Sequence, residues 1–395
     1  MSVASGRMFL AIPGPTTMPD QVLSAMHRPA IDIYSQEMVD LTNSLLDDLS
    51  RLFATTGRSY IYIANGHGAW EAALSNVLSR GDRVLVLESG RFAAKWGVAA
   101  GLMGAETEIL PGSWQSAVSV EALEMRLRAD SSHRIKAILV AQVDTASGVC
   151  NDVEAIGRAI RAAQHPALYM VDAVASLGCI PFAMDEWGID VAVAASQKGL
   201  MTPPGLGFVA AGGRALAAHH NASLRTPYWD WSDRDSDQHY NKYGGTAPVH
   251  LLFALRRALD MIAEEGIDNV LRRHRLLAQA TRHAIAAWAH KDGIGFNIKE
   301  PDQRSDTVTT ITLAAPHDPN RLRDYCRDRC GVILGTGLGD IQHNTFRIAH
   351  MGHINAPMAL GTLAVIETAL KALKIPHGTG GTEAAISYLA EMVHA

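Results

Sequence analysis

The stretches LYMVDA (residues 168–173) and VAVAASQK (residues 191–198) decide the fold of this chain. Each starts as a short apolar run, which is typical of a strand covered by helices on both faces of a parallel sheet. The first run ends at the carboxylate of Asp172, and the second leads to the amine of Lys198. Because ligands of open α/β sheets bind at the carboxyl ends of the strands, we expect this acid and this amine to face one crevice.

Further strand-like runs alternate with amphipathic helical patterns from about Gly57 to Gly212. In residues 67–79 apolar side chains recur at helical spacing until Gly81 ends the pattern, and residues 152–163 form a second such helix. The predicted strands are Tyr60–Ala64, Arg83–Leu87, Lys136–Ala141, Leu168–Val171, Val191–Ala194 and Leu206–Ala211. This alternation predicts an α/β domain with a largely parallel sheet.

After Gly212 the sequence predicts the end of this domain and then a second, smaller domain. Thr246 is expected to cap one long helix, and residues 267–290 are expected to form another. Residues 233–243 are polar and aromatic without periodicity, so they are predicted to be a loop. Strand-like and helix-like runs then alternate again toward the C-terminus. We therefore divide the chain into a large domain of residues 21–265 and a smaller C-terminal α+β domain of residues 266–395.

Composition argues against several classes of partner. Of the 395 residues, 48% are hydrophobic and 19% are charged, and the net charge is -5. Without a long basic stretch this balance argues against nucleic acid, and no run of about 18 apolar residues is available to span a membrane. Four cysteines without a CxxC pair, and no signal-peptide pattern, predict a cytoplasmic protein with reduced thiols.

Two further motifs do not predict a binding site. His350 and His353 have a spacing known from metal ligands, but a glycine lies between them and no third ligand is near, so no metal site is predicted. The glycine-rich stretch GTGLG (residues 335–339) lacks the long helix and downstream acid of a dinucleotide-binding unit.

An acid and an amine at one sheet edge suit pyridoxal phosphate, which carries a basic ring nitrogen and an aldehyde. Lys198 would form a Schiff base with the aldehyde, and Asp172 would keep the ring nitrogen protonated. The alternatives are that Lys198 is a solvated loop lysine and that Asp172 caps a following helix. Asn65, Gly66 and His67 precede a predicted helix whose N-terminus would hold the phosphate, although a plain strand-to-helix turn has the same pattern.

Other residues complete the predicted site. Val174 could pack on one face of the cofactor ring and Phe92 on the other, with Trp96 as a competing candidate for stacking. Thr145 follows another strand end and could hydrogen-bond the phenolic oxygen of the ring. Arg347 lies inside an apolar run, so we expect its guanidinium to bind a substrate carboxylate, with an internal salt bridge as the alternative.

With these residues together, the chain resembles the class V, fold type I pyridoxal-phosphate aminotransferases, and above all the serine–glyoxylate and alanine–glyoxylate aminotransferases. Nearly the whole length takes part in the resemblance, which implies a seven-stranded, mostly parallel sheet in the large domain. The motifs are IPGPT (residues 12–16), WEAAL (70–74), VDAVAS (171–176), SQKGLM (196–201), YGGT (243–246) and RIAHMG (347–352).

The resemblance also implies roles for individual residues. Gln197 would join the phosphate site. Because this family builds its sites across a homodimer interface, Tyr243 and Thr246 would reach the phosphate bound to the other subunit. Residues 1–20 would pack on that partner, and Gly14 would lie near the substrate.

The implied reaction is a ping-pong transamination in which Lys198 moves the α-proton. An amino group passes from a small amino acid (serine, alanine or aspartate) to glyoxylate or another small 2-oxo acid. Ile33 and Tyr34 lie in the segment that the resemblance assigns to substrate specificity. They match neither the histidine–arginine pair of serine–glyoxylate enzymes nor the glutamine of ureidoglycine–glyoxylate enzymes, so the donor stays open.

Alternatives within the fold are a pyridoxamine–pyruvate or aminophosphonate transaminase and a lyase or cysteine desulfurase. A desulfurase needs a mobile cysteine near the substrate, and residues 335–346 contain none. A cofactor-binding regulator without turnover would need a DNA-binding segment, for which we find no candidate.

Overall fold

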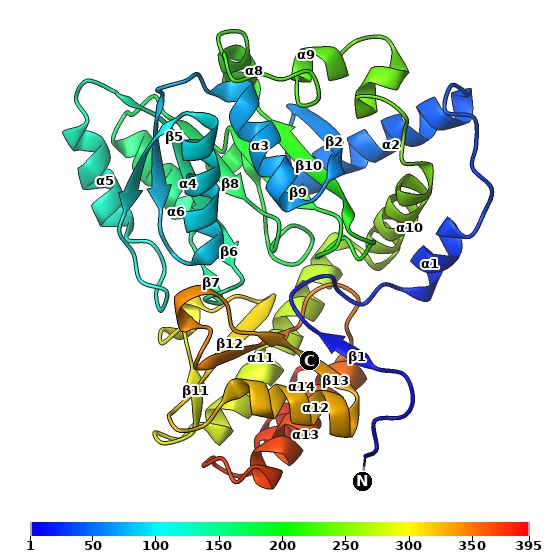
Figure 1. Ribbon diagram of the computed structural model, residues 1–395, viewed down its shortest axis with the longest axis vertical. Coiled ribbons are helices and arrows are strands. Elements are labelled where there is room, and N and C mark those ends of the chain that lie inside the picture. Colours follow the sequence, from blue (N-terminus) through cyan, green and yellow to red (C-terminus); the bar gives the residue numbers. More distant parts are fainter. Residues whose placement is uncertain (1, 394–395) are drawn as a thin grey trace.

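The computed structural model describes residues 2–393 and contains two main sheets, one above the other in Figure 1. The upper sheet has seven strands and carries helices on both faces. The lower sheet has five strands, packs against the C-terminal helices and also takes in a strand from the N-terminus. A third sheet is a two-stranded ribbon of β6 (Val143–Asp144) and β7 (Val149–Cys150). It comes directly after β5 of the upper sheet in the chain.

The seven-stranded sheet has the order β2-β10-β9-β8-β5-β3-β4. Its strands are β2 (Arg58–Ala64), β3 (Arg83–Leu87), β4 (Glu106–Leu110), β5 (Ile135–Ala141), β8 (Leu168–Asp172), β9 (Val191–Ala195) and β10 (Gly205–Ala211). The strands from β9 to β4 run parallel to their neighbours, whereas β10 is antiparallel to both β9 and β2. The predicted mostly parallel, seven-stranded sheet is confirmed.

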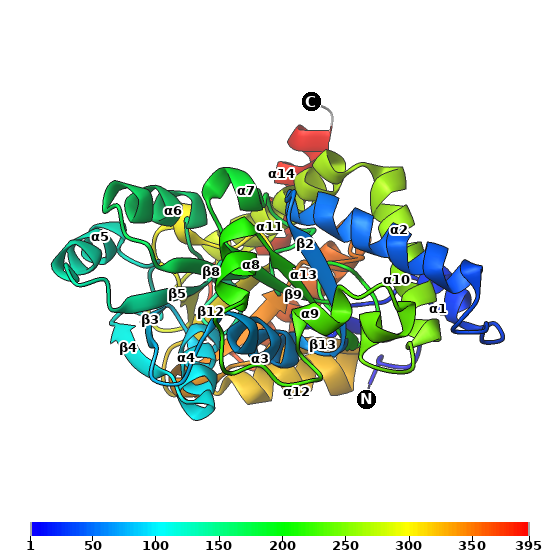
Figure 2. The same ribbon diagram turned by 90° about the horizontal axis from the view of Figure 1, so that it is seen from above.

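Side chains that alternate along each strand give the sheet two buried faces. In β3, Val84 and Val86 join the core beneath α3, α4 and α8, whereas Leu85 and Leu87 join the core beneath α2, α5, α6 and α10. Seen from above, α3 and α4 lie on one side of the sheet and α2 and α6 on the other (Figure 2). The helices are α2 (Gln36–Phe53), α3 (Gly66–Val77), α4 (Arg91–Met103), α5 (Val120–Ala129), α6 (Val153–Ala162), α8 (Gly213–His219) and α10 (Val249–Glu265).

The five-stranded sheet has the order β1-β13-β14-β12-β11. The N-terminal strand β1 runs parallel to β13, with Phe9 opposite Val332, and the other neighbours are antiparallel. That residues 1–20 pack on a partner subunit stays a prediction. The strands are β1 (Phe9–Ala11), β11 (Ile294–Phe296), β12 (Val308–Leu313), β13 (Val332–Thr336) and β14 (Thr345–Ala349). The helices around this sheet are α11 (Ile267–Trp288), α12 (Pro319–Cys330), α13 (Ala356–Ala372) and α14 (Gly381–Val393).

Two local predictions are wrong. Thr246 does not cap α10, because that helix begins at Val249 and no side chain caps it. Residues 233–243 are not a loop throughout, since they include the end of α9 (Trp231–Arg234) and the 3-10 helix η1 (His239–Tyr243). Helices of about one turn are too short to show a hydrophobic period.

The remaining elements are short: α1 (Asp20–Met26), α7 (Met184–Trp187), η2 (Pro301–Gln303) and η3 (Gly339–Ile341). Within residues 2–393, no helix combines the length and apolar character that a membrane crossing requires.

Candidate active site

Lys198 and Asp172 line one cavity, which opens where β8 ends and just beyond the end of β9. The empty volume of the cavity, which includes space open to solvent, is about 480 Å³. Most residues predicted to hold the cofactor border it. The lining consists of Gly66, His67, Trp70, Phe92, Val143, Thr145, Asp172, Val174, Ala175, Gln197 and Lys198.

Asp172 is the last residue of β8 and is only 5% exposed. Its Oδ1 accepts the backbone N–H of Val174 at 2.7 Å, and its Oδ2 accepts the indole N–H of Trp70 at 3.0 Å. Burial raises the pKa of this carboxyl to about 7, against the lowering effect of the two hydrogen bonds. Asp172 does not cap a helix, because the next helix begins only at Met184. Both donors are neutral, so the site offers a buried acid to a cationic group.

Lys198 points toward the N-terminal segment, where its Nζ donates to the backbone oxygen of Pro13. Burial, and next the charge of Arg347, lower the pKa of this amine to about 8. Gly14 has a φ of +96°, and a Cβ there would lie 2.6 Å from the lysine Nζ. Thr16 anchors the segment by donating its Oγ1 hydrogen to the backbone oxygen of Lys198 at 3.0 Å. Residues 12–16 thus pass directly over the amine.

The predicted phosphate end lies at the N-terminus of α3. Asn65 caps this helix, since its Oδ1 accepts the backbone N–H groups of His67 at 3.0 Å and Gly68 at 3.3 Å. A bound phosphate would therefore share or replace these bonds. Gln197 also borders the cavity, and its buried Oε1 has no hydrogen-bond partner within the described residues. That oxygen accepts hydrogen bonds, so only the NH2 group of the same amide could donate to an anion.

The predicted stacking residue that borders the cavity is Phe92, at the start of α4. Trp96 does not line the cavity and instead stacks on Trp70, with ring centroids 6.0 Å apart. Val174 forms another part of the wall and packs against Gly66, where a Cβ would lie 2.9 Å from its Cγ2. Any side chain at position 66 would therefore push this wall away from the helix.

Thr145 lines the cavity just after β6, next to the fully buried Asp144. The carboxylate of Asp144 accepts the backbone N–H groups of Phe92 at 2.7 Å and Ala93 at 3.1 Å. Asp144 thus holds the N-terminus of α4, and with it Phe92, beside Thr145.

Arg347 lies on β14 and is 7% exposed. Its Nε donates to the backbone oxygen of Thr336 at 2.6 Å, and its Nη1 donates to that of Thr145 at 3.0 Å. The internal salt bridge considered for this arginine is not formed with any residue in the range 2–393, because its bonds go to backbone oxygens. Burial lowers its pKa to about 10. Arg347 is not part of the cavity lining, but its charge lowers the pKa of Lys198.

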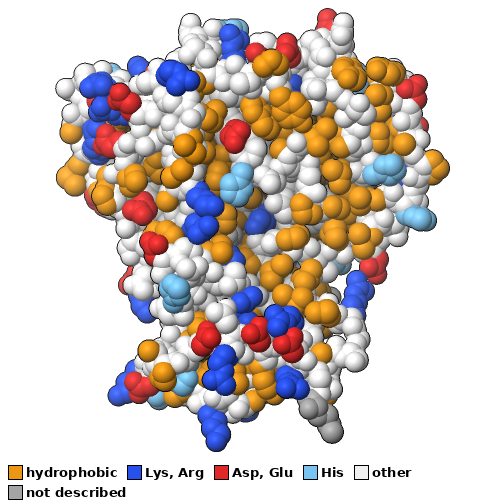
Figure 3. Space-filling model, viewed as in Figure 1, with side chains coloured by type: hydrophobic (Ala, Val, Ile, Leu, Met, Phe, Trp, Pro, Cys, Tyr) orange, Lys and Arg blue, Asp and Glu red, His pale blue; other side chains and the backbone are white. Residues whose placement is uncertain are grey.

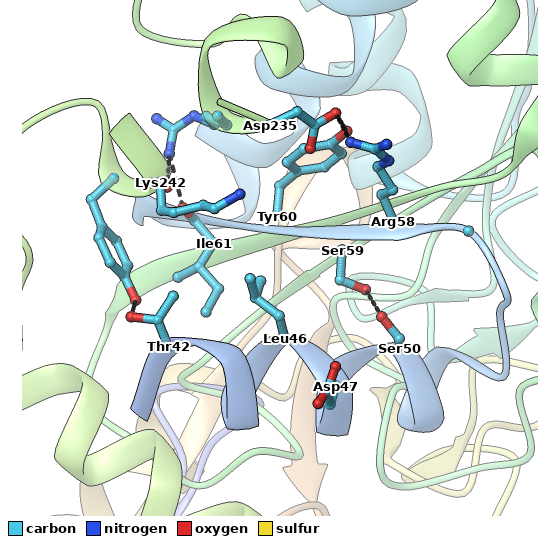
Figure 4. A pocket seen from close by; sticks show the side chains of 13 residues that line it. Thr42, Leu46, Asp47, Ser50, Arg58, Ser59, Tyr60, Ile61, Asp235 and Lys242 are labelled. Atoms are coloured by element: carbon cyan, nitrogen blue, oxygen red, sulfur yellow. Dashed lines mark hydrogen bonds and ion pairs between the residues drawn. The ribbon is translucent and has the colours of Figure 1, made fainter. Parts of the chain in front are cut away.

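Six predicted residues are not part of the cavity lining of their own chain: Gly14, Tyr34, Asn65, Tyr243, Thr246 and Arg347. Tyr34 is 71% exposed and stacks on Tyr240, with centroids 6.1 Å apart. Thr246 is exposed. Tyr243 is buried, and its hydroxyl bonds Thr42 Oγ1 at 2.8 Å in a separate pocket between α2 and β2 (Figure 4).

Three residues near the cavity were assigned no role in the site from sequence. Trp70 belongs to a recognised motif, but the partner of its indole N–H lies on a strand distant in sequence. Asp144 gives a sequence signal, as an acid at a strand end, although its partners are backbone groups of α4. Pro13 contributes only a backbone oxygen, which no residue pattern reveals. Within residues 2–393, no group of three or more His, Cys, Asp or Glu side chains could hold a metal ion.

These residues fit pyridoxal phosphate chemically. The buried Asp172 lacks a cationic hydrogen-bond partner, and the N-terminus of α3 borders the same cavity through Gly66 and His67. Lys198 supplies an amine whose lowered pKa makes it partly neutral near pH 8. The donor set thus matches a ligand with a basic ring, an anionic group and an electrophilic carbon.

The chain belongs to the class-V aminotransferases, since the family described as "Aminotransferase class-V" matches residues 9–353. Enzymes of this family depend on pyridoxal phosphate, and the predicted family membership is confirmed.

Several proteins similar to this chain are named as aminotransferases. The serine–glyoxylate aminotransferase of Methylorubrum extorquens is 40% identical, with 98% of this chain and 97% of the relative covered. The L-aspartate–glyoxylate aminotransferase of Paracoccus denitrificans is 35% identical over 95% of this chain and 94% of its own. Among solved structures, the pyridoxamine–pyruvate aminotransferase of Mesorhizobium loti superposes with a TM-score of 0.90 at 25% identity, covering 99% of this chain and all of the other. The predicted fold type is confirmed.

Proposed function

We propose that this chain is a pyridoxal-phosphate-dependent transaminase that moves the amino group of a small amino acid to glyoxylate or another small 2-oxo acid. The observation that carries the proposal is the meeting of Lys198 and Asp172 in one cavity, whose lining thus offers both an amine and a buried acid. The names of the relatives at 40% and 35% identity support the glyoxylate acceptor.

Pyridoxal phosphate, when bound, supplies an electron sink for the negative charge that develops at the α-carbon of the substrate. Asp172 would hold the proton on its ring nitrogen, and Lys198 would attach it through the amine. Once released, that amine would take the proton from the substrate's α-carbon and return it at the next step, which a pKa of about 8 allows near neutral pH.

The other residues bind and orient. Gln197 and the N-terminus of α3, with Asn65, Gly66 and His67, would hold the phosphate. Phe92 and Val174 would confine the ring, and Thr145 would bond its phenolic oxygen. The guanidinium of Arg347 would hold the substrate carboxylate and thereby set the α-carbon beside Lys198.

The active unit we propose is a cytoplasmic homodimer in which Tyr243 and Thr246 complete the phosphate site of the other subunit, with Tyr34 near its substrate. Exposed aromatic and aliphatic side chains support this arrangement, among them Ile63 at 39%, Tyr228 at 37% and Tyr240 at 42%. Hydrophobic side chains gather on the face around α2, α10 and β2 (Figure 3). Large apolar patches of this kind often mark interfaces.

We also propose the division into residues 21–265 and 266–395. It is supported by the position of Gly266, which separates α10 from α11 at a φ of +81°.

A half-reaction screen tests the proposed function. Purified holoenzyme is mixed separately with serine, alanine, aspartate, aminoethylphosphonate and pyridoxamine, without acceptor. The cofactor's visible absorbance should fall with at least one of the three amino acids and recover when glyoxylate is added. A response to aminoethylphosphonate or pyridoxamine alone would contradict the proposed donor class, and no response to any donor would contradict transamination.

A further inference from the structure

The indole of Trp70 makes a hydrogen bond to which the proposed function assigns no role. Trp70 lies on α3, is 2% exposed, and donates from Nε1 to Oδ2 of Asp172 at 3.0 Å. This is the only side-chain hydrogen bond that the structure gives to Asp172 among residues 2–393. The other bond, from Val174 N, comes from the backbone just beyond the acid and cannot tie it to another element.

Trp70 lies on the same helix as the residues of the predicted phosphate end. Residue 70 follows Gly66 by one helical turn, so the two residues lie on the same side of α3. Gly66 and His67 form the helix N-terminus at the predicted phosphate end. One helix therefore carries both the predicted phosphate end and the donor that bonds Asp172.

Neighbouring rings hold the Trp70 indole in place. His67 meets it edge-on with centroids 4.5 Å apart, and Trp96 stacks on it at 6.0 Å with an interplanar angle of 18°. Trp96 is equally buried, but its Nε1 has no hydrogen-bond partner within the described residues. The two tryptophans thus share one aromatic stack, and only one of them bonds the acid.

We propose that Trp70 is a positioning residue whose indole N–H fixes the Asp172 carboxylate in its ionised form, aimed at the ring nitrogen of bound pyridoxal phosphate. The inference rests on the proposed function, since it requires Asp172 to meet the cofactor. A donor that bonds a carboxylate favours its charged form over its neutral form. The ionisable groups that act on Asp172 are Lys198, just beyond β9, and Asp144 on β6, and His67 on α3 contacts the Trp70 ring.

The test compares Trp70→Phe with Trp96→Phe, both prepared as cofactor-free protein and titrated with pyridoxal phosphate at several pH values. Both variants lose an indole from the same stack, but only the first loses a bond to Asp172. Trp70→Phe should bind the cofactor about tenfold or more weakly at neutral pH. The defect should shrink at alkaline pH, where Asp172 is ionised without help. Trp96→Phe should keep the affinity and the pH profile of the wild type.

Some results would overturn this inference, and a different result would overturn the proposed function. Equal losses in both variants, or a Trp70→Phe defect that does not change with pH, would overturn the inference and assign Trp70 to packing. A Trp70→Phe variant that binds like the wild type would overturn it as well. A wild-type protein that binds no pyridoxal phosphate would instead sink the proposed function.

A second measurement needs no folded Trp70 variant. In wild-type protein labelled at the indole nitrogens of its seven tryptophans, one N–H resonance should move with pH and again when the cofactor binds. The same resonance should be displaced in Asp172→Asn. If no indole N–H resonance shifts both with pH and on cofactor binding, the hydrogen bond does not report the ionisation of Asp172, and the inference fails.

Discussion

Arg347 donates from Nη1 to the carbonyl oxygen of Thr145 at 3.0 Å, which ties β14 of the five-stranded sheet to the turn after β6. Its Nε is held in the same way by Thr336. Backbone oxygens orient this guanidinium, and within residues 2–393 Asp144 acts on its charge without forming a salt bridge to it. Such a group is well placed to bind a carboxylate that enters with the substrate.

Replacing Arg347 with alanine should raise the KM for the amino donor far more than it weakens cofactor retention. Loss of one partner of a buried charged pair costs about 2–5 kcal/mol, which is roughly 30-fold or more in KM. Steady-state kinetics with the donor found in the screen measures this. Arg347→Lys should recover only part of the loss, because an ammonium lacks the planar fork.

Arg323→Ala is the matched control, since Arg323 also donates to a backbone oxygen of β13, that of Leu334, but its charge is not among those that act on Lys198. Its KM should stay near that of the wild type. An unchanged KM in Arg347→Ala, or equal effects in the two variants, would remove Arg347 from the substrate site.

Asp172→Asn should lower kcat by about 100-fold or more, because removing one partner of a buried ion pair costs about 3–5 kcal/mol. The neutral amide cannot keep the ring nitrogen protonated. Asp190→Asn provides the comparison: Asp190 is also 5% exposed and accepts a backbone N–H, that of Tyr169, at 2.7 Å. That variant should lose stability in thermal unfolding but keep its kcat. Near-normal turnover in Asp172→Asn would show that the acid has no role in the chemistry.

Gly14→Ala should fold yet attach the cofactor slowly, because its Cβ would lie 2.6 Å from Lys198 Nζ and displace the amine. Gly81→Ala controls for backbone strain, since Gly81 has a similar φ of +84° and open space around it. Both variants should lose about 1–2 kcal/mol of stability to the left-handed backbone. Only Gly14→Ala should change the attachment rate in stopped-flow absorbance, and identical rates in the two variants would argue against contact between residues 14 and 198.

The rate of cofactor attachment to cofactor-free protein should rise with pH and level off above about pH 8. Burial lowers the pKa of Lys198 from 10.5 to about 8, and only the neutral amine attacks the aldehyde. Above that pKa the amine is mostly neutral, so further base adds little. A rate that keeps climbing to pH 10 would indicate an ordinary, solvated lysine.

The strands of the parallel sheet could be predicted because most of each buried strand is apolar, as in residues 84–87 and 168–171. The edge strand Glu106–Leu110 escaped prediction because it begins with three polar residues and none of its residues is buried. Thr246 suits a helix cap by residue type, but α10 begins at Val249 without any side-chain cap.

Much of the candidate site could also be predicted, since Asp172 and Lys198 follow strands whose ends meet at one edge. Bonds between distant elements could not. The partner of Trp70, for example, depends on how α3 crosses β8. The placement of Tyr34, Tyr243 and Thr246 relative to a second subunit likewise depends on contacts that a single chain does not contain.

The most direct test of the central claim is to reduce the holoenzyme with borohydride and map the modified peptide by mass spectrometry. We expect the mass of the reduced pyridoxyl phosphate adduct on Lys198, and no such adduct in Lys198→Ala, which should also lose the visible absorbance and turnover. Lys136→Ala, which alters an exposed lysine of β5, should keep all three properties. An adduct at another lysine, or an active enzyme without any adduct, would contradict the account.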